Sequence, residues 1–316
     1  MHTPSFFMAA RLSAVNTLKN NARDNTLVML AGLFFIMVLI SAYLGWSATA
    51  TVNSIYAKAV PALQALGRPI PANPVGDAPV LSLFRNMVPY VALLGGLAAI
   101  VLGHQSVAVD RKAGVLPLLF SRPVSQGAVA LGKGMAMVIS IIAILLVSGL
   151  VSVITLLILP STVLNNAIWL GILKFYLVSG LYLTAFGFLG AYFASICKTE
   201  SMALLLPVTI WLTLTFIFPQ LTSNIGPMAA LNPLSANLVP PTGSFFNFTS
   251  KVLGPFSIVE AFRHLASNIL EVKSGAGNAI TTKGAILSLV FTNLAVIIIF
   301  VISFRTIEAS RSDYRD

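Results

Sequence analysis

The stretch Met135–Leu159, MAMVISIIAILLVSGLVSVITLLIL, holds no charged residue and consists mostly of Ile, Leu, Val, Met and Ala. A helix needs about 20 consecutive apolar residues to cross the hydrocarbon core of a bilayer. This stretch meets that requirement over its whole length. The sequence therefore predicts that the segment is a transmembrane helix.

Five other segments meet the same requirement, so we predict six spans in all. They are about Leu27–Ser47, Val88–Val109, Ile172–Ile196, Met202–Phe218 and Ala285–Phe304. The first span follows a polar or amphipathic lead of 26 residues, whereas the apolar core of a signal peptide is shorter and starts sooner. We therefore expect the first span to be retained.

The composition excludes a water-soluble protein. Apolar residues make up 57% and charged residues 9% of the chain, and the mean hydropathy is +0.91. A soluble domain carries about 25% charged residues, because its surface must face water. The predicted fold class is an all-α membrane protein.

The net charge of +10 comes from 19 basic and 9 acidic residues that are dispersed along the chain. Several basic residues stand directly beside apolar runs, which suits contact with phospholipid headgroups. No basic cluster alternates with aromatic residues, so we expect membrane lipid and no nucleic acid as a partner. The single cysteine, Cys197, can form neither a disulfide within the chain nor a cysteine-based metal site.

Six spans place both termini on one side of the membrane, and the basic residues indicate which side. The segments on the side of the termini are the N-terminal lead, the loops between spans two and three and between spans four and five, and the C-terminal tail. They hold eleven basic residues, mostly beside helix ends: Arg11, Lys19, Arg23, Arg111, Lys112, Arg122, Lys133, Lys198, Arg305, Arg311 and Arg315. The segments on the other side hold eight that are spread over much longer loops. Basic residues in short loops mark the cytoplasmic side, so we predict that both termini are cytoplasmic.

The segments outside the spans divide the chain further. Residues 1–26 interleave bulky apolar and basic residues, including Phe7, Arg11, Val15 and Lys19, which predicts an amphipathic helix in the membrane interface; the alternative is a short solvated lead-in. Residues 27–304 form the transmembrane domain, with extracytoplasmic loops at 49–87 and 219–283, and residues 305–316 form a cytoplasmic tail.

The longer extracytoplasmic loop is not a polar linker. Phe245, Phe246 and Phe248 suggest a surface that packs on a partner, for which a periplasmic accessory protein is a candidate. Ser257–Lys273 has apolar residues every three to four positions and predicts an amphipathic helix, with Gly275 as its stop.

The cytoplasmic loop 110–133, between spans two and three, carries the functional argument. An apolar block at Val115–Phe120 is bounded by Arg111 and Lys112 on one side and by Ser121, Arg122 and Pro123 on the other. An apolar block outside the bilayer needs a partner that buries it. A short helix that docks into a groove of a soluble protein is one solution.

The loop is similar to the cytoplasmic loop of ABC-2-type permeases. These show an acidic-basic start, a Gly, a Leu-rich run, a Ser-x-Pro element and a Leu-Gly-Lys entry into the third span. The matching residues are Asp110, Arg111, Gly114, Leu116, Leu118, Leu119, Ser121, Pro123, Val124, Ser125, Leu131, Gly132 and Lys133. The six-span layout and Asn232–Pro233–Leu234 also match, whereas Val115 stands where many members have Thr.

The resemblance implies a permease of the bacterial inner membrane that pairs with a second permease, either an identical copy or a similar chain, and binds two ATPase subunits. The loop between spans two and three would carry a coupling helix, and the N-terminal helix would be an interface helix that also touches the ATPase. The implied coupling residues are Arg111, Lys112, Gly114, Leu116, Leu118, Leu119, Phe120, Ser121, Arg122 and Pro123.

The chain itself is expected to be non-catalytic and to hold no cofactor or metal. Gly127–Lys133 matches the spacing of a phosphate-binding loop, but Gly134 follows where the motif needs Ser or Thr, and a span follows instead of a nucleotide domain. ATP and magnesium would therefore be bound by the partner ATPase.

Three functions remain open on the sequence. The first is the permease subunit of an ATP-driven exporter of an unidentified substrate. The second is a permease of the same fold that drives a periplasmic partner without passing a substrate. The third is an ATP-independent transporter, which the absence of a carboxylate pair within the spans disfavours.

Overall fold

The computed structural model describes residues 5–73, 75–76, 79–116, 124–158, 165–223, 243–272 and 281–305, and these ranges contain no strand. The helices are α1 (Phe6–Arg23), α2 (Thr26–Ala65), α3 (Met87–Tyr90), α4 (Gly96–Lys112), α6 (Gln126–Ile158), α7 (Asn166–Ile196), α8 (Glu200–Leu212), α9 (Phe218–Ser223), α11 (Ser244–Leu253), α12 (Ile258–Ile269) and α13 (Thr282–Arg305). Two π-helical turns, η2 (Val91–Gly95) and η3 (Thr213–Ile217), join α3 to α4 and α8 to α9. Short 3-10 turns are η1 (Val80–Phe84) and η5 (Gly254–Phe256).

Six helical stretches in the described part of the chain are long and apolar enough to cross a membrane. They are Thr26–Ala65, Met87–Lys112, Gln126–Ile158, Asn166–Ile196, Glu200–Thr222 and Thr282–Phe304. Each contains most or all of one predicted span. The prediction of an all-helical protein with six apolar spans is confirmed.

Helix α2 is much longer than the predicted first span. It continues from Ser47 to Ala65, through residues that the sequence analysis assigned to a loop beginning at residue 49. Its 40 residues extend about 60 Å, roughly twice the thickness of the hydrocarbon core. The helix ends where Gly67 adopts a left-handed φ of 62° and its N–H bonds to the carbonyl of Gln64.

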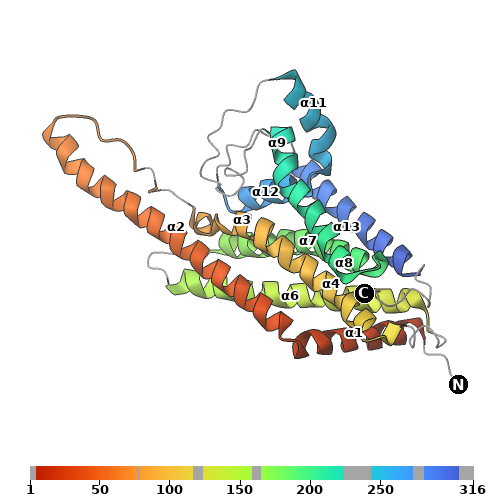
Figure 1. Cartoon of the computed structure of the whole chain (residues 1–316). Helices are drawn as coiled ribbons and strands as arrows, with labels where there is room; N and C mark the ends of the chain where they lie inside the picture. Colours follow the sequence, from red (N-terminus) through yellow and green to blue (C-terminus); the bar gives the residue numbers. More distant parts are fainter. Residues whose placement is uncertain are drawn as a thin grey trace.

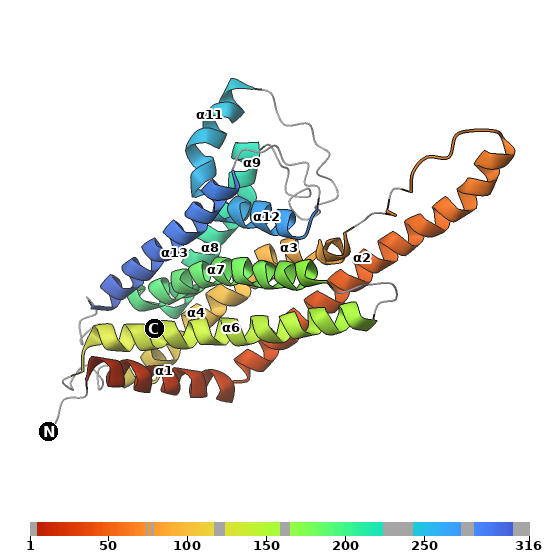
Figure 2. The ribbon, with the colours of Figure 1, turned by 180° about the vertical axis from the view of Figure 1, so that it is seen from behind.

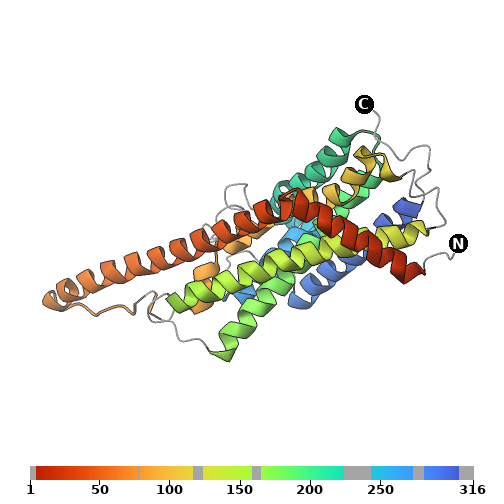
Figure 3. The ribbon, with the colours of Figure 1, turned by 90° about the horizontal axis from the view of Figure 1, so that it is seen from below.

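The long helices run between two ends of the bundle (Figures 1 and 2). We call one the terminal end, where α1 begins, α4 ends, α6 begins, α7 ends and α13 ends. We call the other the distal end, where α6 ends, α7 begins and α12 lies across the bundle. The outer half of α2 leaves the bundle at the distal end as a separate rod, and α1 crosses under α6 at the terminal end (Figure 3).

Helices α4 and α7 pack backbone to backbone in the middle of the bundle. A Cβ atom on Gly103 would lie 1.8 Å from the carbonyl oxygen of Gly187, and a Cβ atom on Gly190 would lie 2.3 Å from that of Ile100. Small residues at a crossing let helix backbones approach closely, which is a main source of packing energy between membrane helices. The central contact therefore requires glycine at these positions.

Helix α12 closes the bundle at the distal end. Its buried face holds Val259, Phe262 and Ala266, and the ring of Phe262 stacks on that of Tyr182 at a centroid distance of 4.5 Å. The predicted helix Ser257–Lys273 exists, but it ends at Ile269 instead of continuing towards Gly275. It ends early because Glu271 adopts a left-handed φ of 54°, and the N–H groups of Leu270 and Glu271 close the last turn.

Replacing Gly103 by Ala should destabilise the protein by about 1–3 kcal/mol or more, because the added methyl group meets the α7 backbone and not a flexible side chain. Gly32→Ala is the matched control, since a Cβ atom there has no neighbour within 4 Å. Thermal unfolding of both variants in detergent measures the difference. Equal midpoints would contradict the close α4–α7 contact.

Candidate functional site

Three consecutive charged residues, Asp110, Arg111 and Lys112, end helix α4 at the terminal end. Successive residues of an α-helix point about 100° apart, so the three side chains leave α4 in three directions. Asp110 contacts α6, Arg111 contacts the end of α7, and Lys112 contacts the start of α8. We call these residues the α4 clamp, because they join α4 to three other helices within one turn.

The contact of Asp110 with α6 is a buried ion pair. Lys133 Nζ contacts Asp110 Oδ2 and donates a further hydrogen bond to the carbonyl oxygen of Ser106 at 2.7 Å. The side chain of Lys133 is 1% exposed and that of Asp110 is 15% exposed. A buried ammonium group is tolerated only when it is paired and hydrogen-bonded. The pair therefore fixes the position of α4 relative to α6.

Arg111 caps the carboxyl end of α7. Its Nη1 donates hydrogen bonds to the carbonyl oxygens of Ala194 and Cys197 at 2.7 and 2.8 Å, and the residue is buried. The last carbonyl groups of a helix lack partners within the helix and carry its negative dipole end, so a cation is favourable there. Burial raises the pKa of the adjacent Cys197 thiol, although the charge of Arg111 opposes this shift.

Lys112 forms the exposed member of the α4 clamp. Its Nζ lies 2.6 Å from Glu200 Oε1, and the side chains are 56% and 42% exposed. Glu200 stands in the first turn of α8, where a carboxylate is favourable, and Thr199 caps that turn by accepting from the N–H of Met202. Water screens an exposed pair of this kind, so we expect it to stabilise the protein much less than the pair of Asp110 with Lys133.

The loop after the α4 clamp begins with a turn that only glycine adopts readily. Gly114 has a φ of 63°, and its N–H bonds to the carbonyl of Arg111, which ends α4. Leu116 is fully buried in the core of the chain, whereas Val115 is 39% exposed. The other predicted coupling residues, Leu118, Leu119, Phe120, Ser121, Arg122 and Pro123, lie outside the described residues.

Helix α1 is seated on the first turns of α6. A Cβ atom on Gly132 would lie 2.4 Å from the carbonyl oxygen of Ala10, and the Ser13 hydroxyl donates to the carbonyl of Val129 at 3.2 Å. The buried face of α1 consists of small or polar residues. Because Val129 and Gly132 lie within one turn of Lys133, α1 and the α4 clamp bind the same short part of α6.

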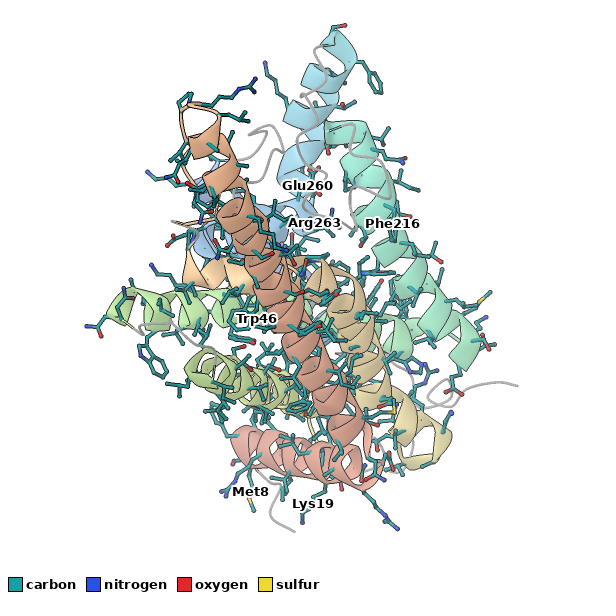
Figure 4. The ribbon with its side chains drawn as sticks, turned by 90° about the vertical axis from the view of Figure 1, so that its left-hand side faces the viewer. Met8, Lys19, Trp46, Phe216, Glu260 and Arg263 are labelled. Carbon is teal, nitrogen blue, oxygen red and sulfur yellow. The ribbon has the colours of Figure 1, made fainter. Side chains whose placement is uncertain are left out.

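The free face of α1 carries all four residues predicted for an interface helix. Phe7 is 84% and Val15 is 41% exposed, and Arg11 and Lys19 are exposed as well. Figure 4 shows Met8 and Lys19 on the side of α1 that points away from the bundle. Apolar and cationic side chains therefore occur together on one free surface, as in helices that lie at a membrane interface.

The aromatic residues predicted to contact a periplasmic partner lie on α11. Phe245 is 58% and Phe248 is 66% exposed. Phe246 belongs to the same helix, but its side chain lies outside the described residues. Thr249 ties α11 to the end of span five by donating to the carbonyl of Leu221 at 2.6 Å.

Comparison with known protein families assigns the chain to one of them. The sequence model of the family described as ABC-2 family transporter protein matches residues 11–306, which is nearly the whole chain. The chain belongs to the ABC-2 transporter family. No curated protein sequence matches it.

Membership of the ABC-2 family confirms the resemblance seen in the loop 110–133. A protein of this family is a membrane component of a transporter, and the family implies association with ABC ATPase subunits. Together with its six apolar helices, the match identifies the chain as the multi-pass permease subunit of an ABC transporter.

Two ion pairs were not predicted from the sequence. They are the pair of Lys133, at the entry to span three, with Asp110 and the pair of Lys112 with Glu200. The signal that could have found them is the scarcity of charge: an acidic and a basic residue at the ends of two consecutive spans should meet, because neither is easily buried alone. The buried position of Arg111 was also missed.

The α4 clamp predicts unequal costs for removing the lysines of its two ion pairs, Lys133 and Lys112. Lys133→Met should destabilise the ABC-2 permease by about 3–5 kcal/mol, because Asp110 is left as an unpaired, largely buried charge. Lys112→Met should cost about 0–1 kcal/mol, since its pair is exposed. Thermal or denaturant unfolding of the purified chain measures both.

A double variant, Asp110→Leu with Lys133→Met, is the control for this prediction. It removes both charges together, so it should be more stable than Lys133→Met alone. If all three variants lose the same stability, the ion pair does not hold α4 to α6.

Proposed function

We propose that this permease is an exporter subunit of the bacterial inner membrane and that ATP hydrolysis in two separate ATPase subunits moves its spans. A second permease, either an identical copy or a similar chain, completes the transporter. The α4 clamp is the observation that carries this proposal, because it makes the helix before the coupling loop one unit with α6, α7 and α8. A force applied to the loop is then shared by four helices.

In this proposal the terminal end is the cytoplasmic end. It holds α1, the loop between α4 and α6 and the short connection between α7 and α8, which together carry most of the basic residues found in short segments. The positive-inside rule places such segments in the cytoplasm. Both chain termini are then cytoplasmic.

The proposed coupling surface consists of the loop residues that are not buried in the core of the chain. Arg111 and Leu116 are buried, so they position the loop and do not themselves contact the ATPase. Lys112 and Val115 are exposed beside them, and the apolar residues Leu118, Leu119 and Phe120 follow in the sequence. The proposed contact is therefore the apolar block Val115–Phe120, seated in a groove of the ATPase and flanked by Lys112.

Helix α1 is proposed as a second contact with the ATPase and with the membrane interface. Its free face offers apolar side chains to lipid and Arg11 and Lys19 to phosphate headgroups. Its buried face rests on α6 within a turn of Lys133. A movement of α1 is thus passed to the same turns of α6 that the α4 clamp holds.

The proposal assigns ATP and magnesium to the partner ATPase. The stretch Gly127–Lys133, which has the spacing of a phosphate-binding loop, forms the first turns of helix α6. A phosphate-binding loop instead wraps around the phosphates between a strand and a helix, and its Ser or Thr after the Lys holds magnesium. Here Gly134 occupies that position.

Leu119→Asp should weaken binding of the ATPase by about tenfold or more, because a charge would enter a groove that buries an apolar side chain. Leu66→Asp, at the far end of α2, is the matched control, since that leucine is 70% exposed on the distal side. Co-purification and vanadate-sensitive ATP hydrolysis of the complex measure the effect. Unchanged assembly and transport in Leu119→Asp would favour an ATP-independent transporter.

The exposed aromatic side chains of α11 favour a second candidate function. In that case the permease drives a periplasmic partner without passing a substrate, and Phe245 and Phe248 form part of the contact. Aromatic side chains are enriched in protein interfaces because they bury a large area with few torsions to order.

The double substitution Phe245→Ser with Phe248→Ser tests the second candidate. Binding of the periplasmic partner should fall by about tenfold or more, while assembly with the ATPase is unchanged. Substitution of Tyr43, which is 63% exposed on α2, by Ser is the control for loss of an exposed aromatic residue. Retained binding of the partner by the α11 variant would overturn the candidate.

A further inference from the structure

Helix α12 carries a buried guanidinium group with unused hydrogen-bond donors. Nε and Nη2 of Arg263 are both buried, and neither has a hydrogen-bond partner in the part of the chain that the structure describes. Burial also lowers the pKa of Arg263 below its ordinary value. Leaving buried donors of a charged group unpaired is strongly unfavourable, so this position favours an occupant that accepts hydrogen bonds.

The two unused donors lie on the same edge of the guanidinium plane. Adjacent N–H groups on one edge are the arrangement that binds a carboxylate or a phosphate through two parallel hydrogen bonds. The Arg263 residue as a whole is partly exposed, although these two atoms are buried. The guanidinium group therefore lies close to the surface of the distal end, with these two nitrogen atoms shielded from solvent.

The carboxylate nearest in sequence, Glu260, does not satisfy Arg263. Glu260 stands one turn earlier on α12, and its charge favours the charged form of Arg263. Its Oε1, however, accepts a hydrogen bond from the Thr222 hydroxyl at 2.6 Å. Among the described residues the ion pairs are those of Lys112 with Glu200 and of Lys133 with Asp110, so Arg263 forms none there.

The surroundings of Arg263 combine polar groups with aromatic rings. Figure 4 shows Glu260 and Arg263 on the side of α12 towards the helix that carries Phe216. Tyr182 lies near enough to Arg263 to interact with its charge and donates its hydroxyl to the carbonyl of Ala92 at 2.8 Å. Trp211 also donates to this carbonyl, at 3.3 Å.

Two π-helical turns border the same place. Ala92 belongs to η2, and the buried Thr215, which lies beside the Tyr182 hydroxyl, belongs to η3. Turns of this kind are rare and occur often at functional sites, because they widen a helix locally and redirect its groups. In this chain they occur in spans two and five, opposite α12.

We propose that Arg263, at the place where α12 meets η2 and η3, binds a carboxylate or phosphate group, carried either by an amphiphile at the membrane surface or by a free anion. The guanidinium edge supplies two parallel hydrogen bonds, and Phe262, Tyr182 and Trp211 supply an apolar wall beside it. Glu260 limits the affinity because it adds a negative charge next to the bound group. The site lies in this chain alone, so it stands or fails independently of coupling to an ATPase.

The experiment measures binding to the purified full chain in an uncharged detergent. The probes are dodecanoate, the uncharged dodecanol of equal chain length, and inorganic phosphate. The variants are Arg263→Gln, Arg263→Lys, Glu260→Gln and, as the control for loss of one distal positive charge, Lys251→Gln on the exposed side of α11. Titration calorimetry gives Kd, and thermal unfolding shows whether each variant is folded.

Dodecanoate or phosphate should bind the wild type and Lys251→Gln equally and should bind Arg263→Gln about tenfold to a hundredfold more weakly, the loss expected for hydrogen bonds to a charged group. Arg263→Lys should also bind weakly, because an ammonium group lacks the paired edge. Glu260→Gln should bind more tightly than the wild type. Binding of dodecanoate but not phosphate identifies an amphiphile as the source, and binding of phosphate identifies a free anion.

Several results would overturn the proposal. These are equal affinity of the wild type and Arg263→Gln, equal affinity for dodecanol and dodecanoate, and no binding of either anion. If Arg263→Gln does not fold, the comparison of wild type with Arg263→Lys and Glu260→Gln decides the question. Tighter binding by Glu260→Gln together with weak binding by Arg263→Lys supports the anion site, and any other order contradicts it.

Discussion

Lys133 carries a positive charge into a place that water scarcely reaches, and Asp110 is the carboxylate that compensates it. In a chain with 9% charged residues and six apolar spans, such a pair is costly to separate and therefore restricts how the helices can move. Arg111 and Lys112 extend the restriction to α7 and α8. The end of α4, and with it the start of the loop, moves only if these helices move too.

The contacts between helices change in kind along the bundle, from close backbone packing in the middle to charged pairs at the terminal end. We expect such an arrangement to transmit movement between the helices. Glycine contacts hold α4 against α7 along the middle, where backbone meets backbone. Charged contacts hold the terminal end, and the exposed pair of Lys112 with Glu200 can exchange partners at low cost. At the distal end, by contrast, Arg263 retains unused donors. Among the described residues, the charges that end α4 at the terminal end are thus paired, whereas Arg263 at the distal end keeps two donors without a partner.

Much of the fold could be predicted because the membrane leaves few choices. A run of about 20 apolar residues has to be a spanning helix, and all six such runs are helices in the structure. The length of α2 could not be predicted in this way, because residues 48–65 are neither strongly apolar nor rich in helix breakers. Helix α2 ends at Ala65, just before the left-handed Gly67, and α12 ends at Ile269, just before the left-handed Glu271, and periodicity reveals neither of these ends.

The sequence pointed to a place for the candidate site but not to its contacts. The unusual composition of the loop 110–133 predicts that a partner docks there, which stays a prediction, and the family match agrees with the resemblance of the loop to ABC-2-type permeases. Which of its residues are exposed to a partner depends on how the helices pack, and this packing could not be predicted from the sequence. Leu116 and Arg111 belong to the loop motif but are buried: Arg111 because α4 directs it onto the end of α7, and Leu116 because the chain turns back at Gly114 into the core.

The most direct test of the account is ATP hydrolysis by the complex isolated from its native membrane through a tag on this permease. If the permease is driven by ATP, the complex contains a second protein with phosphate-loop sequences, and vanadate inhibits the hydrolysis. A folded permease that purifies without any ATPase and without vanadate-sensitive hydrolysis would contradict the proposal that the loop 110–133 receives energy from ATP.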